Sequence, residues 1–301
     1  MSGNLAGTSR DHDAGIIRAR PVKKPGLWVL TVAAIGFVVL VLWTLATSPN
    51  MHWDVIFSYL FPPPILNGAF VTLQLTVISE ALGITLGILL AVMHLSSSRI
   101  LATLSAVYLW TFRSIPLLVQ LIFWFNLGLL FPQLGIPGTP FTLSTNDLIN
   151  GFIAALLGLT LHEAAYQSEI VRGGILAVDS GQVEAAQSLG MSRFLSLRRI
   201  VLPQAIRVII PPMGNQLISL LKGTSLVAFI AGGDLMTSAQ NVYAANFEVV
   251  ALLVVASLWY LALVSLGTFF QRRIERRFNR GIRGSASRNP RLTTQPVLAS
   301  G

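Results

Sequence analysis

The stretch VVALLVVASLWYLALVSLGTFF, residues 249–270, decides the fold class of this chain. It carries no charge, and a helix needs about 20 apolar residues to cross the ~30 Å hydrocarbon core of a bilayer. The whole chain agrees, because 53% of its 301 residues are hydrophobic and only 11% are charged. Soluble domains carry about 25% charged residues. The composition excludes a soluble globule and a disordered chain, and it predicts an all-α, polytopic integral membrane helical bundle.

Five further segments are apolar enough to cross a membrane. They cover residues 27–46, 69–93, 116–131, 151–170 and 208–230. The segment 27–46 is not a signal peptide, because its apolar run is too long and no A-x-A cleavage site follows. The apolar residues from 101 to 115 are expected to lie at the interface as a run-in to the third span. We therefore predict six transmembrane helices, an N-terminal one added to a core of five.

The basic residues give the orientation. The net charge is +9, and all but two of the 21 lysines and arginines lie before residue 27, at Arg99, in residues 172–207 or after residue 270. The alternate loops 47–68, 132–150 and 231–248 contain none. By the positive-inside rule both termini are cytoplasmic, which agrees with an even number of spans.

No enzyme motif is present. The chain has no cysteine and its four histidines are scattered, so we predict no metal site. No lysine follows a glycine, which excludes the phosphate-binding loop of ATPases, and the second histidine of a zinc H-E-x-x-H motif is replaced by Tyr166. Active transport would then need an ion gradient or a separate ATPase subunit.

Residues 173–205 form the one substantial cytoplasmic loop between spans, and they read as two short helices. Asp179 or Ser180 can cap the first helix, and Gly190 can end it in a left-handed conformation. Ser192 can cap a second helix over 193–201, which Pro203 is expected to end. An ordinary hairpin fits this pattern. A DNA-binding helix-turn-helix fits it poorly, because the segment leads directly into a span and leaves no room for a groove.

The same loop carries a resemblance to a known family. The pattern Glu184-Ala185-Ala186-x3-Gly190-x9-Ile200-x-Leu202-Pro203 resembles the signature loop of ATP-binding-cassette (ABC) importer permeases. Four other segments resemble the polar amino-acid subfamily: Asn67-Gly68-x3-Thr72-Leu73, Arg113-Ser114-x-Pro116, Ala165-Tyr166-x2-Glu169-x2-Arg172 and Leu221-Lys222-x-Thr224-Ser225. The resemblance covers residues 67–275. The chain departs from it in its extra N-terminal span and in Ser114-Ile115, where Gly-Thr is common.

The resemblance implies the permease subunit of an ATP-driven amino-acid importer in the inner (plasma) membrane. Its implied partners are two ATPase subunits that bind ATP and Mg, a second permease, identical or paralogous, and an external binding protein, with no nucleic acid. The implied division is a tail 1–26, the extra helix 27–46, the permease domain 67–275 and a basic tail 276–301. A coupling helix near 183–191 would contact the ATPase through Glu184, Ala185, Ala186, Gly190 and Arg193.

Ionisable residues within the spans are costly, so they mark pathways or pairs. We expect two clusters to line the translocation path: His162, Glu163 and Tyr166 in the fourth span, and Lys222, Thr224 and Ser225 in the fifth. Arg113, Glu169 and Arg172 are expected to pair with one another instead. Gly83 and Gly87 are expected to pack one helix on another.

Two further expectations concern the fifth span and the class of transporter. Pro211 and Pro212 are expected to make the first half of that span irregular. The competing functional class is a secondary amino-acid carrier driven by an ion gradient, although no inverted repeat is evident. Co-purification of an ATPase subunit separates the two classes.

Overall fold

The computed structural model describes residues 25–135 and 142–278. The chain divides into two units, residues 1–51 and 52–301, and each is described by itself. The predicted tail 1–26, apart from its last two residues, lies outside the described part. So does the predicted tail 276–301 from residue 279 onward.

The described part of the first unit, residues 25–51, contains one helix, α1 (Pro25–Ala46). It matches the predicted span 27–46 and starts two residues earlier. Every side chain from Trp28 to Ala46 is exposed. Exposed apolar side chains on all faces of a helix are unfavourable in water but favourable in the lipid tails of a bilayer. The exposure of α1 therefore fits a membrane-spanning helix.

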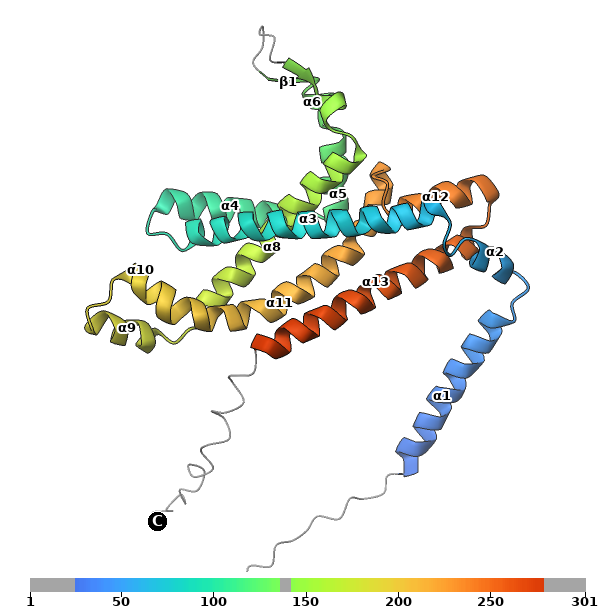
Figure 1. The fold of residues 1–301 in the computed structure, drawn as a ribbon, viewed down its shortest axis with the longest axis horizontal. Helices are drawn as coiled ribbons and strands as arrows, with labels where there is room; N and C mark the ends of the chain where they lie inside the picture. Colours follow the sequence, from blue (N-terminus) through green and yellow to red (C-terminus); the bar gives the residue numbers. More distant parts are fainter. Residues whose placement is uncertain (1–24, 136–141, 279–301) are drawn as a thin grey trace, which may run out of the picture. The chain divides into compact units, whose positions relative to one another are not determined.

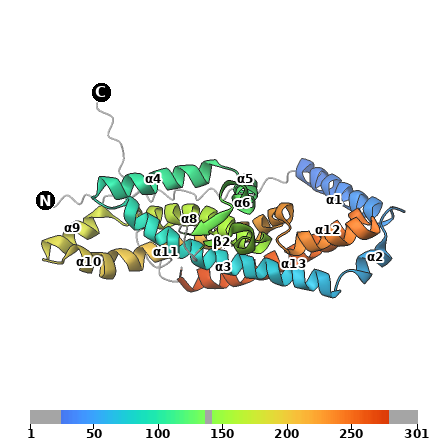
Figure 2. The ribbon, with the colours of Figure 1, turned by 90° about the horizontal axis from the view of Figure 1, so that it is seen from above.

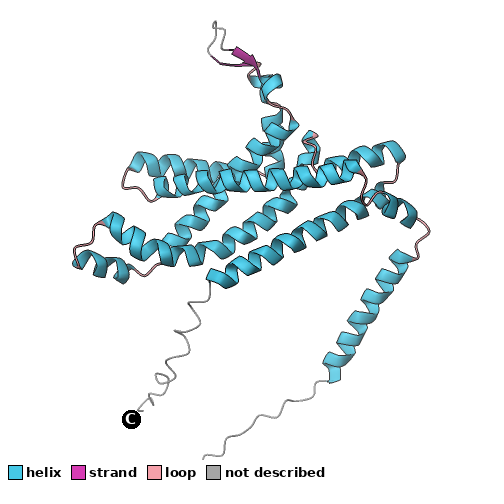
Figure 3. Ribbon diagram, viewed as in Figure 1, coloured by secondary structure: helices cyan, strands magenta, loops and turns pink. Residues whose placement is uncertain are grey.

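The second unit is helical apart from one small ribbon (Figures 1 and 3). Its helices are α2 (Trp53–Ser58), α3 (Pro63–His94), α4 (Arg99–Ser114), α5 (Leu117–Phe125), α6 (Leu127–Leu130), α7 (Thr145–Leu148), α8 (Gly151–Leu176), α9 (Ser180–Ser188), α10 (Arg193–Ser196), α11 (Leu202–Gly223), α12 (Leu235–Asn246) and α13 (Val249–Phe278). A π-turn η1 (Leu197–Val201) joins α10 to α11, and a 3-10 segment η2 (Thr224–Ile230) follows α11. Strands β1 (Gln133–Gly135) and β2 (Thr142–Ser144) pair antiparallel. The predicted all-α class is confirmed.

Helices α3 and α8 form the centre of this unit, and they lie against each other in both views (Figures 1 and 2). Helices α4, α5 and α11 pack on α8, α12 packs on α3, and α13 packs on α11 and α12. The core contains fully buried side chains from several of these elements, among them Leu75, Leu121, Leu159 and Val227.

Two glycines allow α3 and α8 to approach closely. A Cβ atom added at Gly83 would lie 2.8 Å from Cγ of Glu163, and one added at Gly87 would lie 2.7 Å from Cβ of Gln167. Larger residues would therefore push the helices apart. The predicted packing role of the two glycines is confirmed.

Among the described residues, three helices, α1, α3 and α13, are long and apolar enough to cross a membrane. The number rises to five if two bent pairs each count as one span: α4 with α5, bent by 100°, and the helical run from Arg193 to Ile230 with α12, bent by 44°. The predicted third span 116–131 is divided between α5 and α6. Helix α5 rises only about 14 Å, which is half of the hydrocarbon core. The fourth predicted span, 151–170, lies within α8.

Two expectations about prolines are wrong. Pro203 does not end the second loop helix, because α10, η1 and α11 follow one another without a non-helical residue. The π-turn shifts the hydrogen-bond register, and Pro203 falls in the first turn of α11, where no backbone donor is needed. Pro211 and Pro212 lie inside α11, which remains helical through both.

Candidate functional site

The loop predicted to be cytoplasmic, residues 173–205, contains a short helix, α9, that its own sequence caps at both ends. The carboxylate of Asp179 accepts a hydrogen bond from the backbone N–H of Gly181 at 2.8 Å. At the other end Gly190 has a φ of +79°. The N–H of Gly190 donates to the carbonyl of Gln187, and that of Met191 donates to the carbonyl of Ala186. This is the Schellman motif, and it confirms the predicted first cap and left-handed glycine.

The predicted coupling residues occupy two sides of this loop. Glu184, Ala185 and Gly190 are exposed, whereas Ala186 is 2% exposed and faces the rest of the loop. Arg193 starts α10, which Ser192 caps through a hydrogen bond from Leu195 N–H at 3.3 Å. Glu184 and Arg193 line the same groove, of about 540 Å³, between the end of α8 and the two loop helices. The charged members of the predicted set therefore share one recess.

A second polar site lies where α3, α8 and α11 meet. The side-chain amide of Gln167 donates from Nε2 to Oε1 of Glu80 at 2.8 Å and to Oε1 of Glu163 at 2.9 Å. The amide of Gln216 donates to the other oxygen of Glu163 at 3.2 Å. Glu163 and Gln167 are fully buried, and Glu80 is 7% exposed. We call Glu80 and Glu163 the carboxyl pair.

No lysine, arginine or histidine within residues 25–135 and 142–278 forms an ion pair with either member of the carboxyl pair. The same part of the chain contains no group of three or more histidines and carboxylates that could hold a metal ion. The pair accepts its hydrogen bonds from neutral amides, and the two carboxyl groups also lie within hydrogen-bond reach of each other, in a region where charge is costly.

The predicted cluster in the fourth span is divided between two sides of α8. The rings of His162 and Tyr166 lie 4.9 Å apart. Nδ1 of His162 lies 3.2 Å from Nε2 of Gln120, and the guanidinium of Arg113 lies 5.7 Å from the centre of the Tyr166 ring. Glu163 instead faces α3 and α11. Only Glu163 of these three therefore joins the carboxyl pair.

The predicted cluster in the fifth span lies at the junction of α11 and η2. Thr224 is buried and donates to the carbonyl of Leu221, while Ser225 donates to that of Lys222, both at 2.8 Å. Lys222 is exposed. It follows Gln216 by six residues, about 9 Å along the helix axis. No direct contact joins this cluster to Glu163 among the hydrogen bonds and ion pairs of the described residues.

The charges near the end of α8 pair as predicted. Glu169 forms a close ion pair with Arg172 on the same helix, and Nη1 of Arg113 lies 3.9 Å from the same carboxylate. The pair of Arg113 and Glu169 joins α4 to α8, and Arg172 pairs with Glu169 within α8.

Three amides of these sites are not predicted from the charged residues: Gln120, Gln167 and Gln216. Each is neutral, so the cost of burying charge did not single it out. Gln167 carried a signal nevertheless, because it follows Glu163 by four residues and so lies on the same face of the helix.

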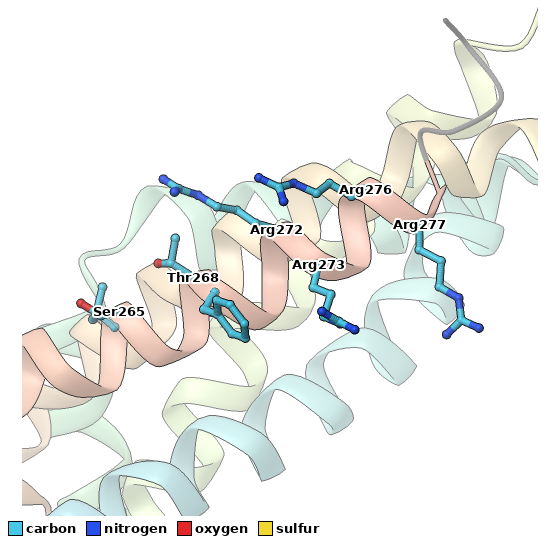
Figure 4. A pocket seen from close by; sticks show the side chains of 8 residues that line it. Ser265, Thr268, Arg272, Arg273, Arg276 and Arg277 are labelled. Atoms are coloured by element: carbon cyan, nitrogen blue, oxygen red, sulfur yellow. The ribbon is translucent and has the colours of Figure 1, made fainter. Parts of the chain in front are cut away.

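Four arginines occupy the end of α13, directly after its apolar part (Figure 4). Arg272 and Arg276 point to one side of the helix, and Arg273 and Arg277 point to the other. All four are exposed, and none forms an ion pair within the described residues. They belong to the basic segment after residue 270, from which a cytoplasmic C-terminus is predicted.

Comparisons with known proteins agree on one family. Residues 83–280 match the family described as "Binding-protein-dependent transport system inner membrane component". The chain is 42% identical over 269 residues to the arginine transport system permease protein ArgU of Corynebacterium glutamicum, covering 88% of this chain and 84% of the relative. It is 35% identical to the L-cystine transport system permease protein TcyB of Bacillus subtilis, covering 79% and 94%.

A solved structure extends the agreement to the fold. The "Crystal structure of an amino acid ABC transporter with histidines" is similar with a TM-score of 0.63 and 31% identity, over 71% of this chain and 94% of that one.

Proposed function

The chain belongs to the family of inner-membrane components of binding-protein-dependent transport systems and is the permease subunit of an ABC amino-acid importer, and we propose that α9 is its coupling helix. It is a multi-pass protein of the inner membrane and is not itself catalytic. A system of this kind includes an ATPase and a binding protein. Family membership therefore sets aside the ion-gradient carrier and the DNA-binding alternatives.

One observation carries the coupling role: α9 is an exposed helix whose ends are fixed by its own caps. Because the caps satisfy backbone groups at both ends, the helix stays folded when a partner protein binds to it. Glu184 offers a carboxylate at the surface, and Ala185 adds little bulk, so a partner surface approaches closely. Arg193 supplies a positive charge beside the same groove.

The assembly we propose has two ATPase subunits, which bind ATP and Mg, and two permease subunits, identical or paralogous, with an external binding protein. In each permease six helices cross the membrane, with both termini in the cytoplasm. The arginines at the end of α13 support this orientation, because basic residues flank spans on the cytoplasmic side (Figure 4). The permease domain is 67–275, and 27–46 is an added span.

The translocation path we propose follows α8 and α11, past His162, Glu163 and Tyr166 on one helix and Lys222, Thr224 and Ser225 on the other. Burial of Glu163 among three helices supports this path, because buried ionisable groups in membranes are functional by default. The names of the relatives differ on the amino acid, since one is an arginine system and another an L-cystine system.

The test of coupling reverses one charge on α9. We expect Glu184→Lys to lower ATP-driven amino-acid uptake at least tenfold in proteoliposomes that contain the ATPase and the binding protein. The reason is that the new ammonium repels the groups that received the carboxylate. The matched control is Asp147→Lys, which makes the same charge change at an exposed position on α7.

Uptake and co-purification are measured together. Reduced co-purification of the ATPase, or a complex that hydrolyses ATP without uptake, supports the proposal. Equal ATP-driven uptake by Glu184→Lys, Asp147→Lys and the unchanged chain refutes it.

A further inference from the structure

Four exposed arginines at the end of α13 form what we call the arginine cluster: Arg272, Arg273, Arg276 and Arg277. Within the described residues none of their guanidinium groups forms an ion pair. The one carboxylate among them, that of Glu275, accepts a hydrogen bond from Nε2 of Gln271. Residues 279–301 add four arginines and no aspartate or glutamate. The sequence around the cluster therefore adds positive charge and no matching acid.

The arginine cluster lies at the depth of lipid headgroups. The uncharged part of α13, residues 249–270, covers about 33 Å, against about 30 Å for the hydrocarbon core of a bilayer. Arg272 and Arg273 follow about 3–5 Å further along the helix axis, and Arg276 and Arg277 about 9–11 Å further. The headgroup layer is about 5–8 Å thick on each side. The first two arginines thus lie within it, and the last two reach back to it along their flexible stems.

The cluster divides into two pairs that face different sides of α13. Arg272 and Arg276 point to one side, and Arg273 and Arg277 point to the other (Figure 4). Residues four positions apart are neighbours on one helix face, so the two guanidinium groups of a pair can hold one anion between them. The planar guanidinium donates two parallel hydrogen bonds to phosphate oxygens. Each pair therefore suits a phosphate group.

An apolar surface adjoins the cluster on the side of the membrane core. Phe269 is 60% exposed, and with Val264, Ser265 and Thr268 it lines the same recess as the arginines. An acyl chain gains free energy by packing on such side chains, whereas a soluble anion gains nothing from them. The order of surfaces along α13, apolar and then cationic, matches that of a phospholipid beside the helix.

We propose that the arginine cluster binds anionic phospholipid, with a phosphate group held by each arginine pair and the acyl chains along the apolar part of α13. A zwitterionic phospholipid offers the same phosphate, but its own ammonium offsets the attraction. A second copy of this chain is a poorer occupant, because it would bring the same arginines to this position. The binding does not depend on the coupling role of α9.

The test counts bound lipid by native mass spectrometry of the purified complex of permease and ATPase. The delipidated complex is titrated with phosphatidylglycerol or with phosphatidylcholine of the same acyl chains. Each arginine near a membrane surface strengthens the binding of anionic lipid about fivefold. We expect the unchanged complex to bind phosphatidylglycerol about tenfold or more tightly than phosphatidylcholine. We expect Arg272→Gln with Arg276→Gln to weaken phosphatidylglycerol binding at that pair about 25-fold and to leave phosphatidylcholine unchanged.

Two double variants and one competitor serve as controls. Arg272→Lys with Arg276→Lys keeps both charges and retains most of the preference for phosphatidylglycerol. Arg198→Gln with Arg199→Gln removes the same charge from exposed positions on η1 and keeps the tight binding. Glycerol phosphate in excess carries the anion without acyl chains, and we expect it not to displace the lipid.

Equal binding of the two lipids by the unchanged complex overturns the proposal, as does full phosphatidylglycerol binding by Arg272→Gln with Arg276→Gln. An equal loss in Arg198→Gln with Arg199→Gln overturns it too, because the attraction is then spread over the basic surface. Displacement by glycerol phosphate assigns the cluster to a soluble anion instead. Loss of the ATPase from Arg272→Gln with Arg276→Gln assigns it to a protein contact instead. None of these results touches the coupling role of α9, which Glu184→Lys tests separately.

Discussion

Gly87 is the position where the contact between α3 and α8 is most easily tested, through Gly87→Ala. The added methyl group would lie 2.7 Å from Cβ of Gln167, 2.9 Å from the backbone N of Ser168 and 3.1 Å from the carbonyl oxygen of Ala164. Carbon atoms prefer separations of about 3.5–4.0 Å. None of these atoms can rotate away, because they belong to the backbone of α8 or are fixed to it. The helices must therefore separate by about 1 Å to restore normal contact.

The expected magnitude comes from two opposed effects. Overpacking of this kind costs about 1–3 kcal/mol, and alanine gains up to about 1 kcal/mol over glycine in helix propensity. Gly173→Ala isolates the second effect, because Gly173 lies on α8 and has nothing within 4 Å of an added Cβ. The difference between the two variants leaves the packing cost alone, about 1–3 kcal/mol in the free energy of unfolding.

The measurement is unfolding of the purified permease by SDS in mixed micelles, followed by tryptophan fluorescence. We expect Gly87→Ala to unfold at lower SDS than Gly173→Ala. Indistinguishable unfolding of the two variants would mean that α3 and α8 are not in close contact at Gly87, and the reasoning would be refuted.

Two further predictions concern the loop and the end of the bundle. Gly190→Ala should cost about 1–2 kcal/mol, because a left-handed φ of +79° is strained for alanine while the space beside it is open. Faster hydrogen exchange of the Met191 amide checks this, and unchanged exchange contradicts it. Trp259→Phe should cost about 0.5–1.5 kcal/mol, because it loses the hydrogen bond from Nε1 to the carbonyl of Leu60 at 2.8 Å. SDS unfolding checks that loss, and an unchanged midpoint argues against it.

The caps of α9 and the close contact of α3 with α8 were predicted from residues near one another in the sequence. Asp179 and Gly190 act at the ends of one short helix, and each acts through hydrogen bonds to residues at most four positions away. The packing of Gly83 and Gly87 follows from their spacing on one face of α3. In each case the deciding interaction lies within one element or on one face of it.

The course of the third span depended on a side-chain contact at a bend, which the apolar pattern does not contain. The chain bends by 100° between α4 and α5, which leaves backbone carbonyls without helical partners. Gln120 supplies the missing donor, since its Nε2 donates to the carbonyls of Phe112 and Ile115 at 2.9 and 2.8 Å. A broken helix is tolerated at membrane depth when protein groups satisfy it in this way. An apolar pattern alone does not show that.

Only part of the polar site was predicted: Glu163 was included, but its separation from His162 and Tyr166 was not. Successive residues of a helix point about 100° apart, so His162 and Glu163 face different neighbours although they are adjacent in sequence. Which neighbour each one meets depends on how α8 lies between α3, α5 and α11. Glu163 and Glu80 are more than eighty residues apart in the sequence. A single sequence contains no signal that they lie side by side.

The unbroken helical run from Arg193 to Ile230 has a mechanical consequence. From Arg193 to Gln216 it covers about 35 Å along the helix axis, and it includes the π-turn η1 and the adjacent prolines Pro211 and Pro212. If α9 couples to an ATPase as proposed, a displacement at Arg193 would reach the amide of Gln216 through this run. Because that amide donates to Glu163, such a displacement would change the hydrogen bonds of the buried carboxyl group. Linkage works in both directions, so a change at Glu163 would act back on the loop that contains α9.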